Sequence, residues 1–247
     1  MKKILALIAF VGLFVSACSE RAETNGELRV GTSPDYKPFN YKEDAKLTGV
    51  DTDLLNEIAK REGITLNWVE INYDGLIPAL KTGKIDMIAS AMSATDERRQ
   101  SVDFSDVYYE STKNLYIKHK DNADLNSRED LEGKALGVQL GSLQEPLANS
   151  IKDAKVQASE DLAVAVLALK SKKIDAVIAG KEVLVGFLME NPDLVAFLEE
   201  DDGTDSGFSF AVDKGKQAEL LNKINKSLKE LKEDGTFDKI ISKYGLN

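Results

Sequence analysis

The chain has 247 residues, of which 43% are hydrophobic and 30% are charged, so it can bury a core and is expected to form one or two globular domains. Its formal net charge is −10, and it has no run of five or more basic residues. Because phosphate binding depends on Lys and Arg, this composition argues against a nucleic-acid partner.

Residues 1–17 have the pattern of a signal peptide for export. Lys2 and Lys3 precede an unbroken apolar run over residues 4–15, and small residues follow. A bilayer-spanning helix needs about 20 apolar residues, so this run is too short for a permanent membrane span. The sequence therefore predicts an exported protein.

Cys18 is the predicted lipidation site. Residues 15–18, Val-Ser-Ala-Cys, resemble the bacterial lipobox, in which the cysteine becomes the lipidated first residue of the mature protein. It is the one cysteine of the chain, so an internal disulfide is excluded. Residues 18–26 are expected to form a lipidated tether, which would anchor the protein to the cell membrane or leave it facing the periplasm. The alternative is an ordinary cleavable signal that happens to end near a cysteine.

Strand and helix signals alternate from residue 28 onward, as in a βαβ architecture. Acidic and capping residues at 51–53 predict the start of a helix, and glycines predict helix ends. The expected elements of this half are strands at 28–32, 65–70 and 85–89, a helix from 51 to Gly63 and a short helix that ends at Gly83.

The phrase LKTGKID at Leu80 returns as LKSKKID at Leu169, inside a second run of the same kind. The elements expected there are a strand at 135–139, a helix opened by Gly141 and Ser142, a helix capped by Ser159 and a strand at 174–179. In each copy small residues follow the buried strand: Ser90, Ala91 and Ser93 in the first, and Ala179 and Gly180 in the second. Ligands of open α/β sheets bind beyond the carboxyl ends of the strands, so two such lobes facing each other would form a cleft. The alternative is that helix-to-strand junctions look alike everywhere.

From residue 28 to the C-terminus the chain resembles the extracellular solute-binding protein family 3, which supplies polar amino acids to ATP-binding cassette importers. The resemblance rests on seven stretches in the same order: LRVGTSPDYKPFNY (28–41), GVDTDLLNEIAKREG (49–63), NYDGLIPAL (72–80), KIDMIASAMSATDERRQSVDFSDVYY (84–109), LEGKALGVQLGSLQE (131–145), KKIDAVIAGK (172–181) and LKEDGTFDKIISKYG (231–245).

This resemblance implies an α/β fold of the periplasmic-binding-protein-like type II class, with two lobes joined by a two-strand hinge and the ligand cleft between them. Lobe 1 is expected at residues 28–115 plus 210–247 and lobe 2 at 116–209, with crossings at 115–118 and 207–212. A monomer is implied that needs no cofactor and no metal. It would capture a small polar amino acid by hinge closure and deliver it to the membrane permease of an importer.

The resemblance also implies which residues hold the ligand carboxylate. Arg98 occupies the position of the family's arginine, whose planar fork can bond both carboxylate oxygens. Ser93 is expected to offer its backbone N–H and hydroxyl to the same group, or a nearby backbone carbonyl to the ligand ammonium, in the loop that also contains Ser90 and Ala91. Gly141 and Ser142 would close from the other lobe, where Leu143 replaces the family's usual hydroxyl residue. Without the resemblance, Arg98 reads as one charge in an exposed charged run.

Two further sets of residues concern the rest of the ligand. Tyr36 and Tyr73 match the positions that sandwich the ligand side chain, although each could be a core tyrosine. Gly180 stands where the family usually has an acid that pairs with the ligand ammonium. Either Asp35, Glu182 or another acid replaces it, or the ligand is not an ordinary α-amino acid. Asp35 is the preferred substitute, but beside Pro34 it could equally be a turn residue.

Two other classes of protein share this fold. The first is a prephenate or arogenate dehydratase, which would need a proton donor in the cleft. The chain's one histidine, His119, is expected near the first crossing as a solvated residue, and no catalytic motif accompanies it. The second is a ligand-sensing module of a receptor, which we expect to carry a membrane or signalling segment that this sequence does not show. A non-enzymatic binding protein is therefore the preferred interpretation.

Overall fold

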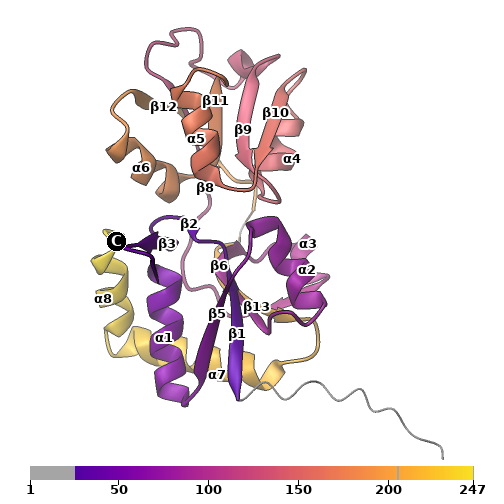
Figure 1. The fold of residues 1–247 in the computed structure, drawn as a ribbon, viewed down its shortest axis with the longest axis vertical. Helices are drawn as coiled ribbons and strands as arrows, with labels where there is room; N and C mark the ends of the chain where they lie inside the picture. The colour runs from indigo at the N-terminus through magenta and orange to yellow at the C-terminus, as the bar shows by residue number, and fades with distance from the viewer. Residues whose placement is uncertain (1–25, 205, 247) are drawn as a thin grey trace, which may run out of the picture.

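The computed structural model describes residues 26–204 and 206–246. The predicted signal peptide, Cys18 and nearly all of the predicted tether lie outside these described residues. Two five-stranded mixed sheets, each flanked by helices, form two lobes that follow each other along the long axis of the molecule (Figure 1).

Lobe 1, the lower lobe in Figure 1, contains the first strand of the described chain and its last two helices. Its strands, in order of pairing, are β5 (Thr65–Glu70), β1 (Glu27–Thr32), β6 (Met87–Ser93), β13 (Phe208–Asp213) and β7 (Val102–Phe104). A small second sheet pairs β2 (Asp35–Tyr36), β3 (Asn40–Glu43) and β4 (Lys46–Thr48). Its helical elements are α1 (Val50–Glu62), η1 (Tyr73–Gly75), α2 (Leu76–Lys81), α3 (Asp96–Arg99), α7 (Ala218–Glu233) and α8 (Thr236–Lys243).

Lobe 2 repeats the same pattern of pairing. Its strands, in order, are β10 (Lys155–Ser159), β9 (Ala135–Gln139), β11 (Ala176–Gly180), β8 (Lys113–His119) and β12 (Leu194–Asp201). Its helical elements are η2 (Glu129–Leu131), α4 (Gln144–Asn149), α5 (Leu162–Lys170) and α6 (Lys181–Glu190). In lobe 1, β1 pairs in parallel with β5 and β6, and in lobe 2, β9 pairs in parallel with β10 and β11. A strand that arrives from the other lobe then pairs antiparallel with the central strand: β13 with β6, and β8 with β11. Within residues 26–204 and 206–246, no helix is long and apolar enough to cross a membrane.

The aspartate of the repeated phrase ties neighbouring strands together in both lobes. Asp86 Oδ2 accepts a hydrogen bond from Arg29 N at 3.0 Å, and Asp175 Oδ2 accepts one from Ala135 N at 2.8 Å. The backbone N–H of each aspartate returns a bond of 2.8 Å to the carbonyl of the same residue, Arg29 or Ala135. Each aspartate thus extends the hydrogen bonding between the two strands to a point just before β6 or β11 begins. These bonds fix the register of β6 against β1 and of β11 against β9.

The isoleucine of the phrase explains a glycine in each neighbouring strand. A Cβ atom added at Gly31 would lie 2.4 Å from Ile85 Cδ1, and one added at Gly137 would lie 2.6 Å from Ile174 Cδ1. Each isoleucine therefore occupies the space that a side chain on the adjacent strand would need. The chain carries the phrase twice because each lobe needs the same junction of helix, strand and neighbouring strand.

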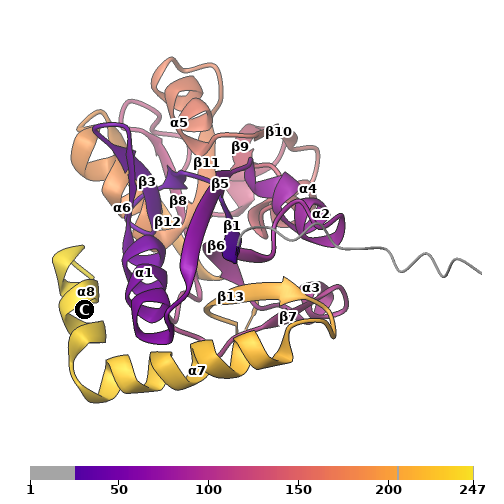
Figure 2. The same cartoon turned by 60° about the horizontal axis from the view of Figure 1, so that its bottom comes forward.

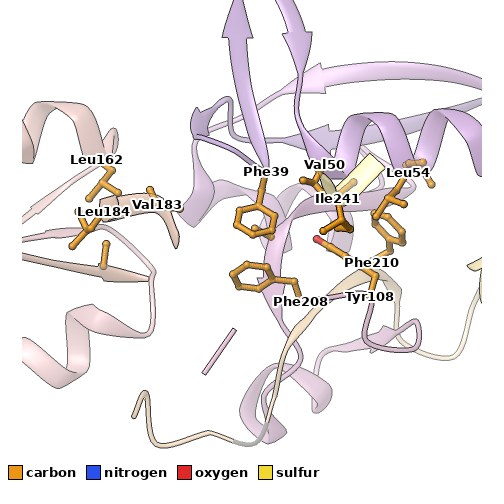
Figure 3. Packing of buried hydrophobic residues seen from close by; sticks show 14 of the residues in the cluster. Phe39, Val50, Leu54, Tyr108, Leu162, Val183, Leu184, Phe208, Phe210 and Ile241 are labelled. Atoms are coloured by element: carbon orange, nitrogen blue, oxygen red, sulfur yellow. The ribbon is translucent and has the colours of Figure 1, made fainter. Parts of the chain in front are cut away.

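The main apolar core of lobe 1 lies between its large sheet and the helices α1, α7 and α8. Figure 2 shows α7 running beneath the lobe with α8 turned up beside α1. Ile224, Leu228 and Leu231 of α7 are buried and belong to this core. Toward the hinge, Phe39 and Phe208 meet edge to face with ring centroids 4.9 Å apart (Figure 3).

The chain changes lobes earlier than the predicted crossings. Residues 115–118 lie inside β8, which pairs with β11 and β12, and residues 208–212 lie inside β13, which pairs with β6 and β7. The connecting segments are therefore residues 110–112 and 202–207. They run side by side, because Asp202 N donates to the Thr112 carbonyl and Phe208 N donates to the Tyr109 carbonyl, each at 2.8 Å.

Smaller differences concern element boundaries. The buried strands begin at Met87 and Ala176, after the isoleucines, so residues 90–93 belong to β6 instead of following it. Asp161, not Ser159, caps α5, because Asp161 Oδ1 accepts a hydrogen bond from Ala163 N at 2.7 Å. Gly63 ends α1 in a left-handed conformation, as predicted.

Gly49, at the start of α1, should be the less replaceable of two glycines that flank this helix. Its φ is 129°, and an added Cβ would lie 2.0 Å from the Phe39 carbonyl oxygen, so Gly49→Ala requires a backbone shift. We expect a loss of about 3 kcal/mol or more in the free energy of unfolding, measured with urea. Gly63→Ala is the control: its φ is also positive, but no atom lies within 4 Å of the added Cβ, so it should cost only about 1 kcal/mol. Equal losses would contradict the steric argument.

Candidate functional site

A cavity lies between the lobes where β6 and β11 end. The space between its lining residues measures about 440 Å³, and this volume includes the part that opens to solvent. The predicted site residues that line it are Tyr36, Tyr73, Ala91, Ser93, Ser142, Leu143 and Gly180. The side chain of Arg98 lies directly behind this lining, whereas Asp35, Ser90 and Gly141 do not line the cavity.

A buried carboxylate holds the end of β6 in position. Asp51, fully buried in the first turn of α1, accepts hydrogen bonds from Ala91 N (2.6 Å), Asn40 Nδ2 (2.9 Å) and Tyr108 Oη (2.6 Å). Burial raises the pKa of Asp51 to about 6, although these three hydrogen bonds oppose the rise. Ala91 has a φ of 44°, which is uncommon for a residue with a side chain. Asp51 therefore stabilises the unusual backbone that lines the cavity; from the sequence it was expected only to start the helix.

Arg98 links the two lobes beside the cavity. Its Nη1 donates to the Ser93 carbonyl at 3.1 Å, and its Nη2 donates to the Gly141 carbonyl at 3.2 Å. The guanidinium also lies over the ring of Tyr73, 5.5 Å from its centroid. Among the residues that the structure describes, no carboxylate forms an ion pair with Arg98. A half-buried guanidinium held only by carbonyls and a ring keeps the capacity to bind an anion.

The loop from Gly141 to Leu143 brings lobe 2 against lobe 1. Gly141 has a φ of 73°, and an added Cβ would lie 3.0 Å from Asp74 Cα, so only glycine allows this approach. Its N–H was predicted to face the ligand, but it donates instead to Glu145 Oε2 at 2.7 Å. Ser142 lines the cavity, and its buried hydroxyl has no hydrogen-bond partner within the structure. Such an unpaired polar atom is costly unless something else bonds it.

Three aromatic rings line the cavity. Tyr36, Tyr73 and Phe208 all line it, and Tyr36 meets Phe208 edge to face at a centroid separation of 6.5 Å. These rings could cover the aliphatic, imidazole or guanidinium part of a side chain and exclude water from it.

Gly180 lacks a side chain because Tyr36 occupies the space. A Cβ added at Gly180 would lie 2.5 Å from Tyr36 Oη, and the Gly180 backbone hydrogen-bonds this hydroxyl. Burial holds the pKa of Tyr36 well above its usual value, so the hydroxyl stays protonated. An acid at position 180 would therefore need the Tyr36 ring to move.

Asp35 contacts lobe 2 directly and does not line the cavity. Its Oδ2 accepts hydrogen bonds from Gln139 Nε2 (2.7 Å) and Leu162 N (3.1 Å), and its Oδ1 accepts one from Ser33 Oγ (2.7 Å). Both oxygens of the Asp35 carboxylate are therefore used in hydrogen bonds within the protein. This arrangement does not favour the predicted role of Asp35 as the partner of the ligand ammonium. Ser90 is likewise structural in this arrangement, because its Oγ accepts a hydrogen bond from Ser33 N at 3.0 Å.

Glu182, the other suggested acid, is also engaged elsewhere. Its Oε2 accepts a hydrogen bond from Ser111 Oγ at 2.8 Å, and Glu182 does not line the cavity. The acid that does line it is Asp202, in the second connecting segment.

Several lining residues escaped the sequence reasoning. They are Ser111 and Asp202 in the connecting segments, Lys113 and Asn114 at the start of β8, Gln139 at the end of β9, Gln144 at the start of α4 and Phe208 at the start of β13. Asn114 is opposite Gly180 in the β8–β11 ladder, and its Oδ1 accepts a hydrogen bond from Gln144 Nε2 at 2.7 Å. Residues at a hinge border the cleft, so a correctly placed first crossing would have pointed to Ser111, Lys113 and Asn114. The predicted crossing at 115–118 begins just after these residues.

His119 lies at the far end of β8 from Lys113 and does not line the cavity. Its Nδ1 is 3.4 Å from Asp121 Oδ2, and its Nε2 is 4.0 Å from Asp193 Oδ2. In the described part of the chain, no group of three or more His, Cys, Asp or Glu side chains could hold a metal ion.

Comparisons with known proteins agree with this geometry. The family model of bacterial extracellular solute-binding proteins, family 3, matches residues 28–247. The chain is 58% identical to a probable histidine-binding protein of Campylobacter jejuni, across 100% of both chains. It is 37% identical to the arginine-binding extracellular protein ArtP of Bacillus subtilis, across 99% of this chain and 98% of that protein.

A solved structure shows the same fold. An ancestral arginine-binding protein bound to arginine superposes with a TM-score of 0.83 at 40% identity, covering 89% of this chain and 98% of that one. These likenesses confirm the predicted class of two α/β lobes.

The stability of the protein should report the titration of Asp51. Its pKa in the folded protein, about 6, lies above the ordinary value of 3.8, so the folded state holds the proton more tightly and stability falls as the pH rises through this window. A tenfold change in proton affinity is worth about 1.4 kcal/mol, so the effect should be about 3 kcal/mol.

The measurement is urea unfolding of the wild type and of Asp51→Asn between about pH 4 and pH 7. The free energy of unfolding of the wild type minus that of the variant should fall by about 3 kcal/mol over this range and stay constant above it. A difference that is independent of pH would show that Asp51 titrates normally in the folded protein.

Proposed function

The chain belongs to the bacterial extracellular solute-binding proteins, family 3, and from this premise we propose that it captures an amino acid between its lobes for the permease of an ATP-binding cassette importer. The relatives carry the names of binding proteins, and this chain is accordingly a binding protein and not an enzyme.

One observation carries the proposal: a guanidinium without a carboxylate partner lies beside a cavity that contains an unpaired hydroxyl. Arg98 is held by one carbonyl from each lobe, and the Ser142 hydroxyl has no partner in the described structure. A ligand carboxylate that took the place of the Gly141 carbonyl would satisfy both groups. Ser93, which lines the cavity and already contacts Arg98, could add a backbone N–H or its hydroxyl.

The rest of the cavity suits a polar amino acid with a flat or extended side chain. Tyr36, Tyr73 and Phe208 offer ring surfaces, while Asn114 and Gln144 offer amide groups. Relatives named for histidine or arginine fit these features, because imidazole and guanidinium groups are both planar and both carry hydrogen-bond donors. We therefore place histidine and arginine at the head of the candidate ligands.

Contacts between the lobes support a mechanism of hinge closure. Besides the Asp35 contacts, Asn72 Nδ2 donates to Glu160 Oε2 at 2.6 Å, and Lys37 Nζ lies 3.0 Å from Glu190 Oε1. A ligand that bonds Arg98 on one side and Ser142 on the other would add to these contacts only when the lobes meet. Its differential affinity for the closed form would then shift the equilibrium toward closure, which the permease would read.

Export and anchoring complete the proposal. The apolar run of residues 4–15 and the lipobox ending at Cys18 support an exported lipoprotein whose lobes face the compartment outside the cell membrane. Polar residues 19–26 would separate the lipid from the folded part by a tether. Mass spectrometry of the mature N-terminus tests this: a diacylglyceryl group on Cys18 supports it, and cleavage elsewhere refutes it.

The ligand assignment is tested by a thermal-shift screen of the common amino acids followed by calorimetry. Histidine or arginine should raise the melting temperature, since a ligand at 100 times its Kd stabilises by about 2.7 kcal/mol. Arg98→Ala should weaken the binding of the amino acid that the wild type binds by about 2–5 kcal/mol, because it removes the partner of the ligand carboxylate.

Arg99→Ala is the matched control. Arg99 is adjacent and also basic, but its Nε donates to the Ala94 carbonyl at 3.0 Å and its guanidinium lies over Phe104, away from the cavity lining. The Kd of Arg99→Ala for the amino acid that the wild type binds should stay within about twofold of the wild-type value. If Arg98→Ala bound as tightly as Arg99→Ala, the carboxylate assignment would be wrong.

Hinge closure makes a separate prediction for small-angle scattering. Addition of the bound amino acid should lower the radius of gyration of the wild type, because a ligand held by both lobes favours their contact. Under the same ligand concentration Arg98→Ala should keep the dimensions of the free protein. Unchanged dimensions of the wild type, with binding proven by calorimetry, would refute the closure mechanism.

A further inference from the structure

Asp202 is the carboxylate placed to take over the charge that Gly180 lacks. Of the described residues that line the cavity, it alone carries a carboxylate. We propose that Asp202 pairs with the positive group of the bound amino acid and so determines the specificity of the site. This inference rests on the proposed function.

The position of Gly180 in the sheet shows where the counter-charge has moved. Gly180 pairs with Asn114 of β8, and Asn114 pairs on its other side with Glu200 of β12. Asp202 follows Glu200 by two residues, where β12 passes into the connecting segment. Adjacent strands lie about 4.8 Å apart, so β12 is about 10 Å from β11 across the sheet. Asp202 therefore borders the same cavity from the segment that follows β12, two strands away from Gly180.

Position 180 cannot hold an acidic side chain, because the Tyr36 ring occupies the space that its Cβ would need. The Tyr36 hydroxyl lies 2.5 Å from the place of a Cβ at Gly180. Tyr36 is neutral, and its pKa is raised by burial, so it supplies no negative charge there. A cationic group of the ligand must find its counter-charge elsewhere in the cavity, since an unpaired buried cation is costly.

Within the described part of the chain, the carboxylate of Asp202 has no ion-pair partner. Thr204 N and Thr204 Oγ1 both donate to Asp202 Oδ1, at 2.8 and 2.9 Å, and no described residue donates a hydrogen bond to Oδ2. Lys113, the base in the cavity lining, pairs with Asp201 instead, with Nζ 2.5 Å from Asp201 Oδ1. Among residues 26–204 and 206–246, no cation forms an ion pair with Asp202.

The turn at Thr204 does not explain why this residue is an acid. An asparagine would accept the same hydrogen bonds through Oδ1, because only one oxygen is used. The turn fixes the direction of the side chain, and the second oxygen is left for a ligand. A fixed, charged acceptor in a partly enclosed cavity is the arrangement that a cationic ligand group requires.

The test is calorimetric titration of Asp202→Asn with L-histidine and L-arginine. For whichever amino acid the wild type binds, Kd should rise by about 10- to 100-fold, as expected for the loss of a hydrogen bond to a charged group. Glu199→Gln is the control. It also removes one negative charge, from the strand β12 that precedes Asp202, but Glu199 is exposed and pairs with Lys181 at 2.8 Å, so the Kd of this variant should stay within about twofold of the wild type.

Neutral analogues distinguish the two groups that Asp202 could face. If it faces the side chain, the wild type should prefer arginine to citrulline, or histidine to thienylalanine, and Asp202→Asn should abolish that preference. If it faces the α-ammonium, the variant should lose affinity for the charged and the neutral ligand by the same factor. Either result supports the proposal.

Two controls make a negative result decisive. Circular dichroism should show an unchanged fold, and Asp202→Ser, whose hydroxyl can accept the same turn hydrogen bond, serves if Asp202→Asn does not fold. A wild type that binds no amino acid would overturn the proposed function. A wild type that binds one, with Asp202→Asn or Asp202→Ser binding as tightly, would overturn this inference alone.

Discussion

The parallel register of two strand pairs is the constraint on which the site depends. In each lobe an aspartate before the central strand accepts a hydrogen bond from the backbone of the neighbouring parallel strand. In lobe 1 Asp86 bonds Arg29 of β1, and in lobe 2 Asp175 bonds Ala135 of β9. This contact decides which residues of β6 and β11 reach the carboxyl edge of their sheets. A slip of one residue would turn Ser93 or Gly180 away from the cavity, so the repeated phrase sets the position of the site as well as the fold.

The site itself combines fixed groups with groups that await a partner. Asp51 fixes the backbone at Ala91 through a hydrogen bond from a buried carboxylate. The buried charge lowers the stability of the fold above the pKa of Asp51, but it holds the backbone that lines the cavity in place before a ligand binds. Arg98, Ser142 and Asp202 are the opposite kind, because each keeps bonding capacity that the described protein does not use. Binding proteins gain affinity when the protein is ordered before the ligand arrives, and this division of roles provides that order.

Much of the fold followed from periodicity and from the repeated phrase, but the crossings did not. The segments at 115–118 and 207–212 were correctly seen as extended, yet an extended segment in a sheet and one between sheets have the same apolar pattern. Within the site, motif positions brought Tyr36, Ser93 and Ser142 to the cavity, whereas Asn114 and Asp202 were missed. Their placement depends on antiparallel pairing between strands distant in sequence, and neither composition nor spacing encodes that pairing locally.

The paired connecting segments limit how the lobes can move. Asp202 and Thr112 are joined by a backbone hydrogen bond, and Phe208 and Tyr109 by another, so the two connections form a single short ribbon instead of two independent strings. A ribbon resists sliding and lateral shear but bends easily across its width. The lobes are therefore expected to separate mainly by rotation about this ribbon, because its two connections must bend together.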